Sequence, residues 1–119
     1  MSEQKGKQEI VSSTRLEGDN LLASVRGEVD LHNSPELRGA LLAAVGKHRF
    51  TRLILNLSQV PYMDSSAIAV LVEVLQKVKR AGGKVCLTNL QPRVKGLLEI
   101  ARLGTVFVLV KDEEEAKTK

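Results

Sequence analysis

The chain has 119 residues, of which 43% are hydrophobic and 27% are charged, and its formal net charge is +4. This length and composition fit one domain able to bury roughly 65% of the surface of its unfolded chain, so folding needs no disulfide or metal. The longest apolar runs fall far short of the ~20 residues that a membrane span requires. The polar start and the single cysteine, Cys86, lead us to expect a soluble protein of the reducing cytoplasm.

The positive charge does not by itself indicate a nucleic-acid partner. Basic residues are spread through the chain, and its three aromatic residues, Phe50, Tyr62 and Phe107, are too few for a base-stacking surface. The basic cluster Lys77, Lys79 and Arg80 is typical of the solvated face of a helix. We expect no nucleic-acid partner, no cofactor and no metal site.

The two ends of the chain are predicted to be flexible tails outside the core. Residues 1–8 and 111–119 are short, charged and nearly free of large apolar side chains, so they cannot offset the entropy lost on ordering. The folded domain is therefore expected to span residues 9–110. It should open with an antiparallel hairpin, because predicted strands at 9–17 and 21–26 flank the turn Gly18-Asp19-Asn20.

Helices and strands alternate beyond the hairpin. Ser34-Pro35-Glu36 starts a first helix, Gly82-Gly83 ends a second, and Pro92 begins a third. The predicted strands between and after these helices are 53–57, 84–88 and 106–110. This order predicts an α/β fold with a mixed sheet of about five strands, opened by the hairpin, with helices after strands 2, 3 and 4.

The segment from Val60 to Val70 is the best candidate for a functional site. It joins a buried strand to the second helix through Asp64, Ser65 and Ser66. Free backbone N–H groups and the positive end of the helix dipole meet at such a start, which suits a phosphate or another anion. Asp64 or Ser65 would also serve simply as a helix cap, and the local sequence leaves both interpretations open.

The topology allows two other loops to build one surface with this helix start, but the sequence alone does not establish that they do. In open sheets, sites gather beyond the carboxyl ends of the strands, where 89–91 and the loop after the second strand both lie. Ala69 falls on the polar side of the helix, where a small residue leaves room for another molecule, although alanine is also simply a good helix former. Val70 lies at the edge of the same patch. The loop after the second strand contributes Asp30, His32 and Asn33.

Several segments together carry a family resemblance: Gly27-Glu28-Val29-Asp30, Leu55-Asn56-Leu57, Val60-Pro61-Tyr62, Gly82-Gly83-Lys84-Val85, and Val94-Lys95-Gly96-Leu97-Leu98 before Leu103-Gly104. The most specific is the Met-Asp-Ser-Ser element at 63–66. With these segments the chain resembles the STAS domain of anti-anti-sigma factors, over about residues 9–110. Ala67 and Ala69 stand where the family pattern usually has glycine, a departure that we interpret as a change of partner specificity.

The resemblance implies a single STAS domain that acts as an anti-sigma factor antagonist. Ser65 would be phosphorylated by a cognate anti-sigma factor serine kinase and reset by a serine phosphatase, with Asp64 and Ser66 supporting the helix cap and the switch. Unphosphorylated protein would bind the kinase and release its sigma factor. The implied partner-binding residues are Asp30, His32, Asn33, Met63, Asp64, Ser65, Ala67, Ala69 and Val70.

Two other classes of protein remain as alternatives. Asp30, His32 and Ser65 could be imagined as a hydrolase triad, but no nucleophile-elbow glycine pattern surrounds Ser65, so we expect no enzyme. STAS-like domains also occur as accessory subunits of membrane transport complexes, where they bind an ATPase subunit. The retained Asp64-Ser65 pair argues against that class, because phosphorylation is not needed for it.

Overall fold

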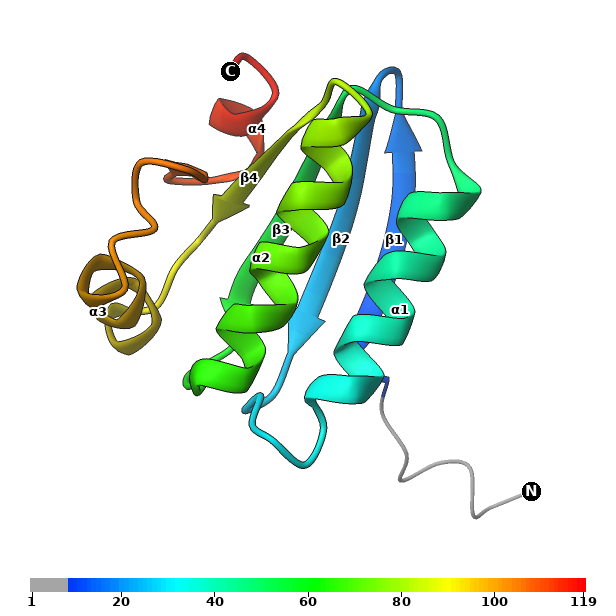
Figure 1. Cartoon of the computed structure of the whole chain (residues 1–119). Coiled ribbons are helices and arrows are strands. Elements are labelled where there is room, and N and C mark those ends of the chain that lie inside the picture. Colours follow the sequence, from blue (N-terminus) through cyan, green and yellow to red (C-terminus); the bar gives the residue numbers. More distant parts are fainter. Residues whose placement is uncertain (1–8) are drawn as a thin grey trace.

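The computed structural model describes residues 9–119, so the predicted N-terminal tail lies outside the described residues. Helices and strands alternate after an opening pair of strands (Figure 1). In chain order the elements are β1 (Val11–Glu17), β2 (Asn20–Arg26), α1 (Ser34–Lys47), β3 (Arg52–Gln59), α2 (Ser65–Arg80), β4 (Lys84–Thr88), α3 (Pro92–Ile100), β5 (Val108–Val110) and α4 (Glu113–Ala116).

The five strands form one mixed sheet in the order β1-β2-β3-β4-β5. β1 pairs antiparallel with β2, and the remaining neighbours are parallel, which confirms the predicted hairpin and crossovers. The hairpin turn depends on Gly18, whose φ of +61° lies in the left-handed region that glycine adopts without strain. Helices α1 and α2 lie side by side over one face of the sheet (Figure 1).

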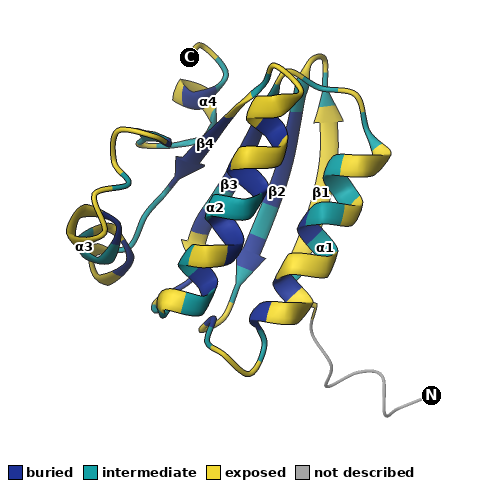
Figure 2. Cartoon of the chain, in the orientation of Figure 1, coloured by how far each residue is buried: buried dark blue, intermediate teal, exposed yellow. Residues whose placement is uncertain are grey.

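The main core fills the space between these helices and the sheet. The central strands are buried, as expected for parallel strands covered by helices, whereas β1 at the edge is largely exposed (Figure 2). Helix α2 presents residues at helical spacing to this core. Its buried residues are Ala67, Val70, Leu71, Val74, Leu75 and Val78. The packing therefore fixes α2 firmly against the sheet and places the start of the helix at the carboxyl ends of the parallel strands.

The C-terminal segment is not the flexible tail that its composition predicts. Residues 113–116 form the short helix α4, and Ala116 is 0% exposed against Leu22, Ile54 and Cys86 on the opposite face of the sheet. The prediction of a flexible tail did not consider that burial of one small apolar residue, Ala116, can hold a short helix against the sheet when the charged residues around it form ion pairs. Cys86 is a buried free thiol, as expected, and burial raises its pKa.

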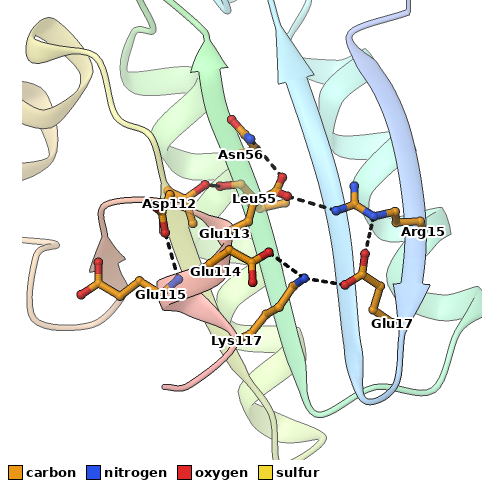
Figure 3. Close-up of polar contacts among 10 residues, drawn as sticks. Arg15, Glu17, Leu55, Asn56, Asp112, Glu113, Glu114, Glu115 and Lys117 are labelled. Atoms are coloured by element: carbon orange, nitrogen blue, oxygen red, sulfur yellow. Dashed lines mark hydrogen bonds and ion pairs between the residues drawn. The ribbon is translucent and has the colours of Figure 1, made fainter.

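Polar contacts hold α4 against the sheet (Figure 3). The Glu113 carboxylate accepts hydrogen bonds from Arg15 of β1 at 3.1 Å and from Asn56 of β3 at 3.0 Å. The ammonium group of Lys117 lies 2.6 Å from the carboxylate of Glu17. Asp112 caps the helix by accepting the backbone N–H of residue 115 at 2.9 Å. These partners come from strands far away in sequence, so composition alone could not reveal them.

Candidate functional site

Asp64 caps helix α2 and thereby fixes the candidate site. Its backbone is extended, with φ −108° and ψ −172°. Its Oδ1 atom accepts the backbone N–H groups of Ser66 at 2.9 Å and Ala67 at 3.3 Å, together with the Ser66 hydroxyl at 2.6 Å. Of the two caps that the sequence allows, the structure uses Asp64, which leaves Ser65 free of that role.

Ser65 is the first residue of α2 and is exposed to solvent. Its hydroxyl makes no hydrogen bond with any residue from 9 to 119, whereas the hydroxyl of Ser66 is bound to the cap. The first turn of α2 contains no acidic residue. The two adjacent serines therefore have different environments, and Ser65 alone offers a free hydroxyl to a partner.

The hydrogen bonds of the cap stabilise the charged form of Asp64. They hold the pKa of its carboxyl below the usual aspartate range, with the Ser66 hydroxyl as the largest cause and backbone N–H groups adding to it. Partial desolvation acts in the opposite direction but is weaker. At neutral pH the helix start therefore already carries a negative charge next to Ser65.

The structure brings the loop after β2 to this helix start, an arrangement that the topology allowed. A parallel bridge joins Val29 to Met63, with the Val29 N–H donating to the Tyr62 carbonyl at 3.0 Å. The Asp64 N–H donates to the Val29 carbonyl at 3.0 Å. The second carboxylate oxygen of Asp64 accepts the backbone N–H of Leu31, also at 3.0 Å. One carboxylate thus connects the loop to the helix.

Asp30 and Asn33 shape this loop through their own side chains. The Asp30 carboxylate accepts the backbone N–H groups of His32 at 2.9 Å and Asn33 at 3.3 Å. The Asn33 side chain accepts the Asp30 N–H at 2.8 Å and donates to the Glu28 carbonyl at 2.9 Å. His32 is exposed. Within residues 9–119 no hydrogen bond links the side chains of Asp30, His32 and Ser65 to one another.

Three of the predicted partner-binding residues lie in the core instead. Met63, Ala67 and Val70 are 2%, 0% and 6% exposed. Ala67 and Val70 lie on the side of α2 that faces the sheet, and Met63 precedes the helix, in the parallel bridge with Val29. The prediction that Val70 lies at the edge of an exposed patch is therefore wrong, and the side chains of Met63 and Ala67, which the resemblance implied to bind a partner, are buried as well. Ala69 is exposed, as predicted.

The loop at 89–91 also reaches the same edge of the sheet. The Gln91 side chain donates to the Ser58 carbonyl at the end of β3, at 2.7 Å. Close by in sequence, the guanidinium carbon of Arg93 lies 4.9 Å from the ring centroid of Tyr62, which is a cation–π distance. Helix α3 is thereby tied to the segment that leads into Asp64.

Leu31 is the residue at this site that sequence reasoning missed. It is 75% exposed, and its N–H is bound to Asp64. The available signal was an apolar residue between polar ones in a loop expected near Ser65.

Among residues 9–119 there is no group of three or more side chains able to hold a metal ion. None of the helices in that range has the length and apolar character needed to cross a bilayer.

Comparison with known families identifies the fold. The family model described as the STAS domain matches residues 12–116. An anti-sigma-B factor antagonist of Bacillus subtilis is 32% identical to this chain over 89 residues, which cover 75% of this chain and 80% of that protein. The chain belongs to the STAS-domain family.

Solved structures show the same fold in two kinds of protein, anti-sigma factor antagonists and an anion transporter. The anti-sigma factor antagonist SpoIIAA in its unphosphorylated form has a TM-score of 0.72 and 24% identity, covering 88% of this chain and 93% of that one. Its phosphorylated Bacillus form has a TM-score of 0.64 and 23% identity, covering 89% and 97%. The murine anion transporter Slc26a9 has a TM-score of 0.76 and 17% identity, covering 87% of this chain but 18% of the transporter.

Proposed function

We propose that this STAS domain is an anti-sigma factor antagonist with Ser65 as its phosphorylation switch. In its unphosphorylated form it binds an anti-sigma factor serine kinase, which then releases its sigma factor. Phosphorylation of Ser65 ends that binding, and a serine phosphatase restores it. The observation that carries the proposal is the free, exposed hydroxyl of Ser65 beside a cap that Asp64 already provides. The proposal implies a cytoplasmic protein.

Phosphorylation should leave the fold intact. The Ser65 hydroxyl makes no hydrogen bond within residues 9–119, so its esterification breaks none there. A phosphoryl group adds about −1.5 to −2 charges at neutral pH, and a helix N-terminus favours negative charge. The modification therefore changes the surface and not the core.

The same charge should act strongly in an interface. The Asp64 carboxylate already occupies the backbone N–H groups of Ser66 and Ala67, so these donors are not free to neutralise a phosphoryl group. A partner that covers Ser65 would bury an uncompensated charge, at a cost of several kcal/mol. Because each ~1.4 kcal/mol changes affinity tenfold, one phosphate would weaken binding a hundredfold or more.

Four variants test this switch with purified kinase and ATP. Ser65→Ala should fold, bind the kinase constitutively and accept no phosphate. Ser65→Asp and Ser65→Glu should fold and bind much more weakly, whereas Ser66→Ala should remain a substrate. Mass spectrometry locates the phosphate and calorimetry measures the affinity. Phosphate on Ser66 alone, or tight binding by Ser65→Glu, contradicts the proposal.

The Ser65 variants also test the alternative that this chain is an accessory subunit of a membrane transport complex. The likeness to part of an anion transporter concerns the fold alone. A pull-down from the source cell should recover a sigma-regulating kinase with the Ser65→Ala protein and lose it with Ser65→Glu. Recovery of a transport ATPase with both variants would instead assign the chain to a transport complex.

A further inference from the structure

Four large apolar side chains stand out as exposed in the described residues, and two of them are almost fully in solvent. Leu31 is 75% and Ile100 82% exposed, while Leu16 and Val106 are less than half exposed. Leu31 lies in the loop bound to the start of α2, whereas Ile100 ends α3. Single exposed apolar side chains are common on protein surfaces, so it is the position of Leu31, on the loop bound to the cap of α2, that distinguishes it from the others.

The loop that carries Leu31 is held in place on both sides. Asp30 and Asn33 exchange hydrogen bonds across it, including Asp30 N–H to Asn33 Oδ1 at 2.8 Å. The Leu31 N–H itself is bound by Asp64 at 3.0 Å. A side chain on such a loop loses little backbone freedom on binding, so burial of its apolar surface translates into affinity.

The Asp64 carboxylate sets the position of Leu31 relative to Ser65. One of its oxygens holds the Leu31 loop and the other holds the first turn of α2, which begins at Ser65. A partner that reaches the Ser65 hydroxyl therefore meets Leu31 at the same edge. Asp30 and Asn33, whose polar groups are used within the loop, act as positioning residues.

We infer that Leu31 is the apolar anchor by which this surface holds the anti-sigma factor kinase, inserting into a pocket of apolar side chains beside the kinase's phosphate-transferring site. This inference rests on the proposed function and names the residue that gives the interface its affinity. It also explains how one phosphate can act as a switch. Binding depends on a small apolar contact, and the charge is placed next to that contact.

The test uses calorimetry with the kinase that binds the unmodified chain. Leu31→Ala and Leu31→Asn should lower affinity tenfold or more, while Leu31→Met should stay within threefold of the unmodified chain. Ile100→Ala is the matched control, because it truncates a similarly exposed apolar side chain on another element and should leave affinity unchanged. Melting followed by circular dichroism should be the same for all four, since neither side chain contributes to the core.

The pattern of results distinguishes a failure of this inference from a failure of the proposed function. If Leu31→Ala and Leu31→Asn bind as tightly as the unmodified chain while Ser65→Glu loses binding, the anchor is wrong and the switch stands. Equal loss for Leu31→Ala and Ile100→Ala also overturns the anchor, because it indicates general apolar association. If no anti-sigma kinase binds the unmodified chain, both the anchor and the proposed function fail.

Discussion

The hydroxyl of Ser66 donates to the carboxylate of Asp64 at 2.6 Å, so the second of two adjacent serines is part of the helix cap. The first serine is not. A kinase that approaches the start of α2 meets a free hydroxyl at Ser65 and an engaged one at Ser66. The division of roles between identical side chains follows from the cap geometry, because the capping carboxylate faces the second and third residues of the helix.

The pH dependence of stability should depend on the Ser66 hydroxyl, whose hydrogen bond lowers the pKa of Asp64. The folded-state pKa of Asp64 is depressed, so its contribution is fully present above the usual aspartate pKa of about 3.9 and is lost as pH falls through the folded value. Ser66→Ala should raise that pKa toward the usual value. Its stability deficit should be largest above about pH 4 and shrink below it.

NMR titration of the Asp64 carboxyl carbon and urea unfolding across pH 2–6, in increments of roughly half a unit, measure both effects. Ser65→Ala is the control and should leave the Asp64 pKa unchanged, because its hydroxyl is not bound to the carboxylate. An equal rise of the pKa in both variants would show that the Ser66 hydrogen bond is not the main cause.

Glycine substitutions at Ala67 and Ala69 should separate effects on stability from effects on partner recognition. Ala67→Gly removes a buried methyl group and lowers helix propensity, which together should cost about 1–2 kcal/mol of unfolding free energy. Ala69→Gly, on the exposed side, should cost about 1 kcal/mol. Calorimetry should find altered kinase affinity only for Ala69→Gly. A change in affinity for Ala67→Gly alone would contradict this prediction, because it would place partner recognition on the buried side of the helix.

Removal of residues 113–119 should destabilise the domain and expose Cys86. The deletion takes away Ala116 and the contacts of Glu113 and Lys117 with the sheet. A loss of only 1 kcal/mol would lower the melting temperature by about 4 °C or more in a domain of this size. Because the chain has one cysteine, a thiol-reactive dye reports directly on the uncovered face.

Deletion of residues 1–8 is the control and should change neither readout, as their composition predicts. Glu113→Gln should speed labelling of Cys86 more than Glu114→Gln, because Glu113 contacts both Arg15 and Asn56. Unchanged melting and labelling after the C-terminal deletion would show that α4 does not cover the sheet in solution.

Local patterns were enough to predict most of the architecture and the start of the site. The Gly18 turn, the Ser34-Pro35 helix start and the glycines at 82–83 act within a few residues, so their effects can be read without knowing the rest of the fold. The same holds for the helix beginning after Asp64. Capping and hydrophobic periodicity depend on neighbours within one or two turns.

Contacts between segments that are distant in sequence were established only by the tertiary structure. The hydrogen bond from Leu31 to Asp64 spans 33 positions, and the contact of Arg15 with Glu113 spans 98. Charged residues at 113–119 look like a solvated tail until the sheet supplies oppositely charged partners. Whether Ala67 or Ala69 meets a partner depends on which side of α2 the sheet covers. Such choices follow from packing, because the favourable term is the surface that two distant segments remove from water together.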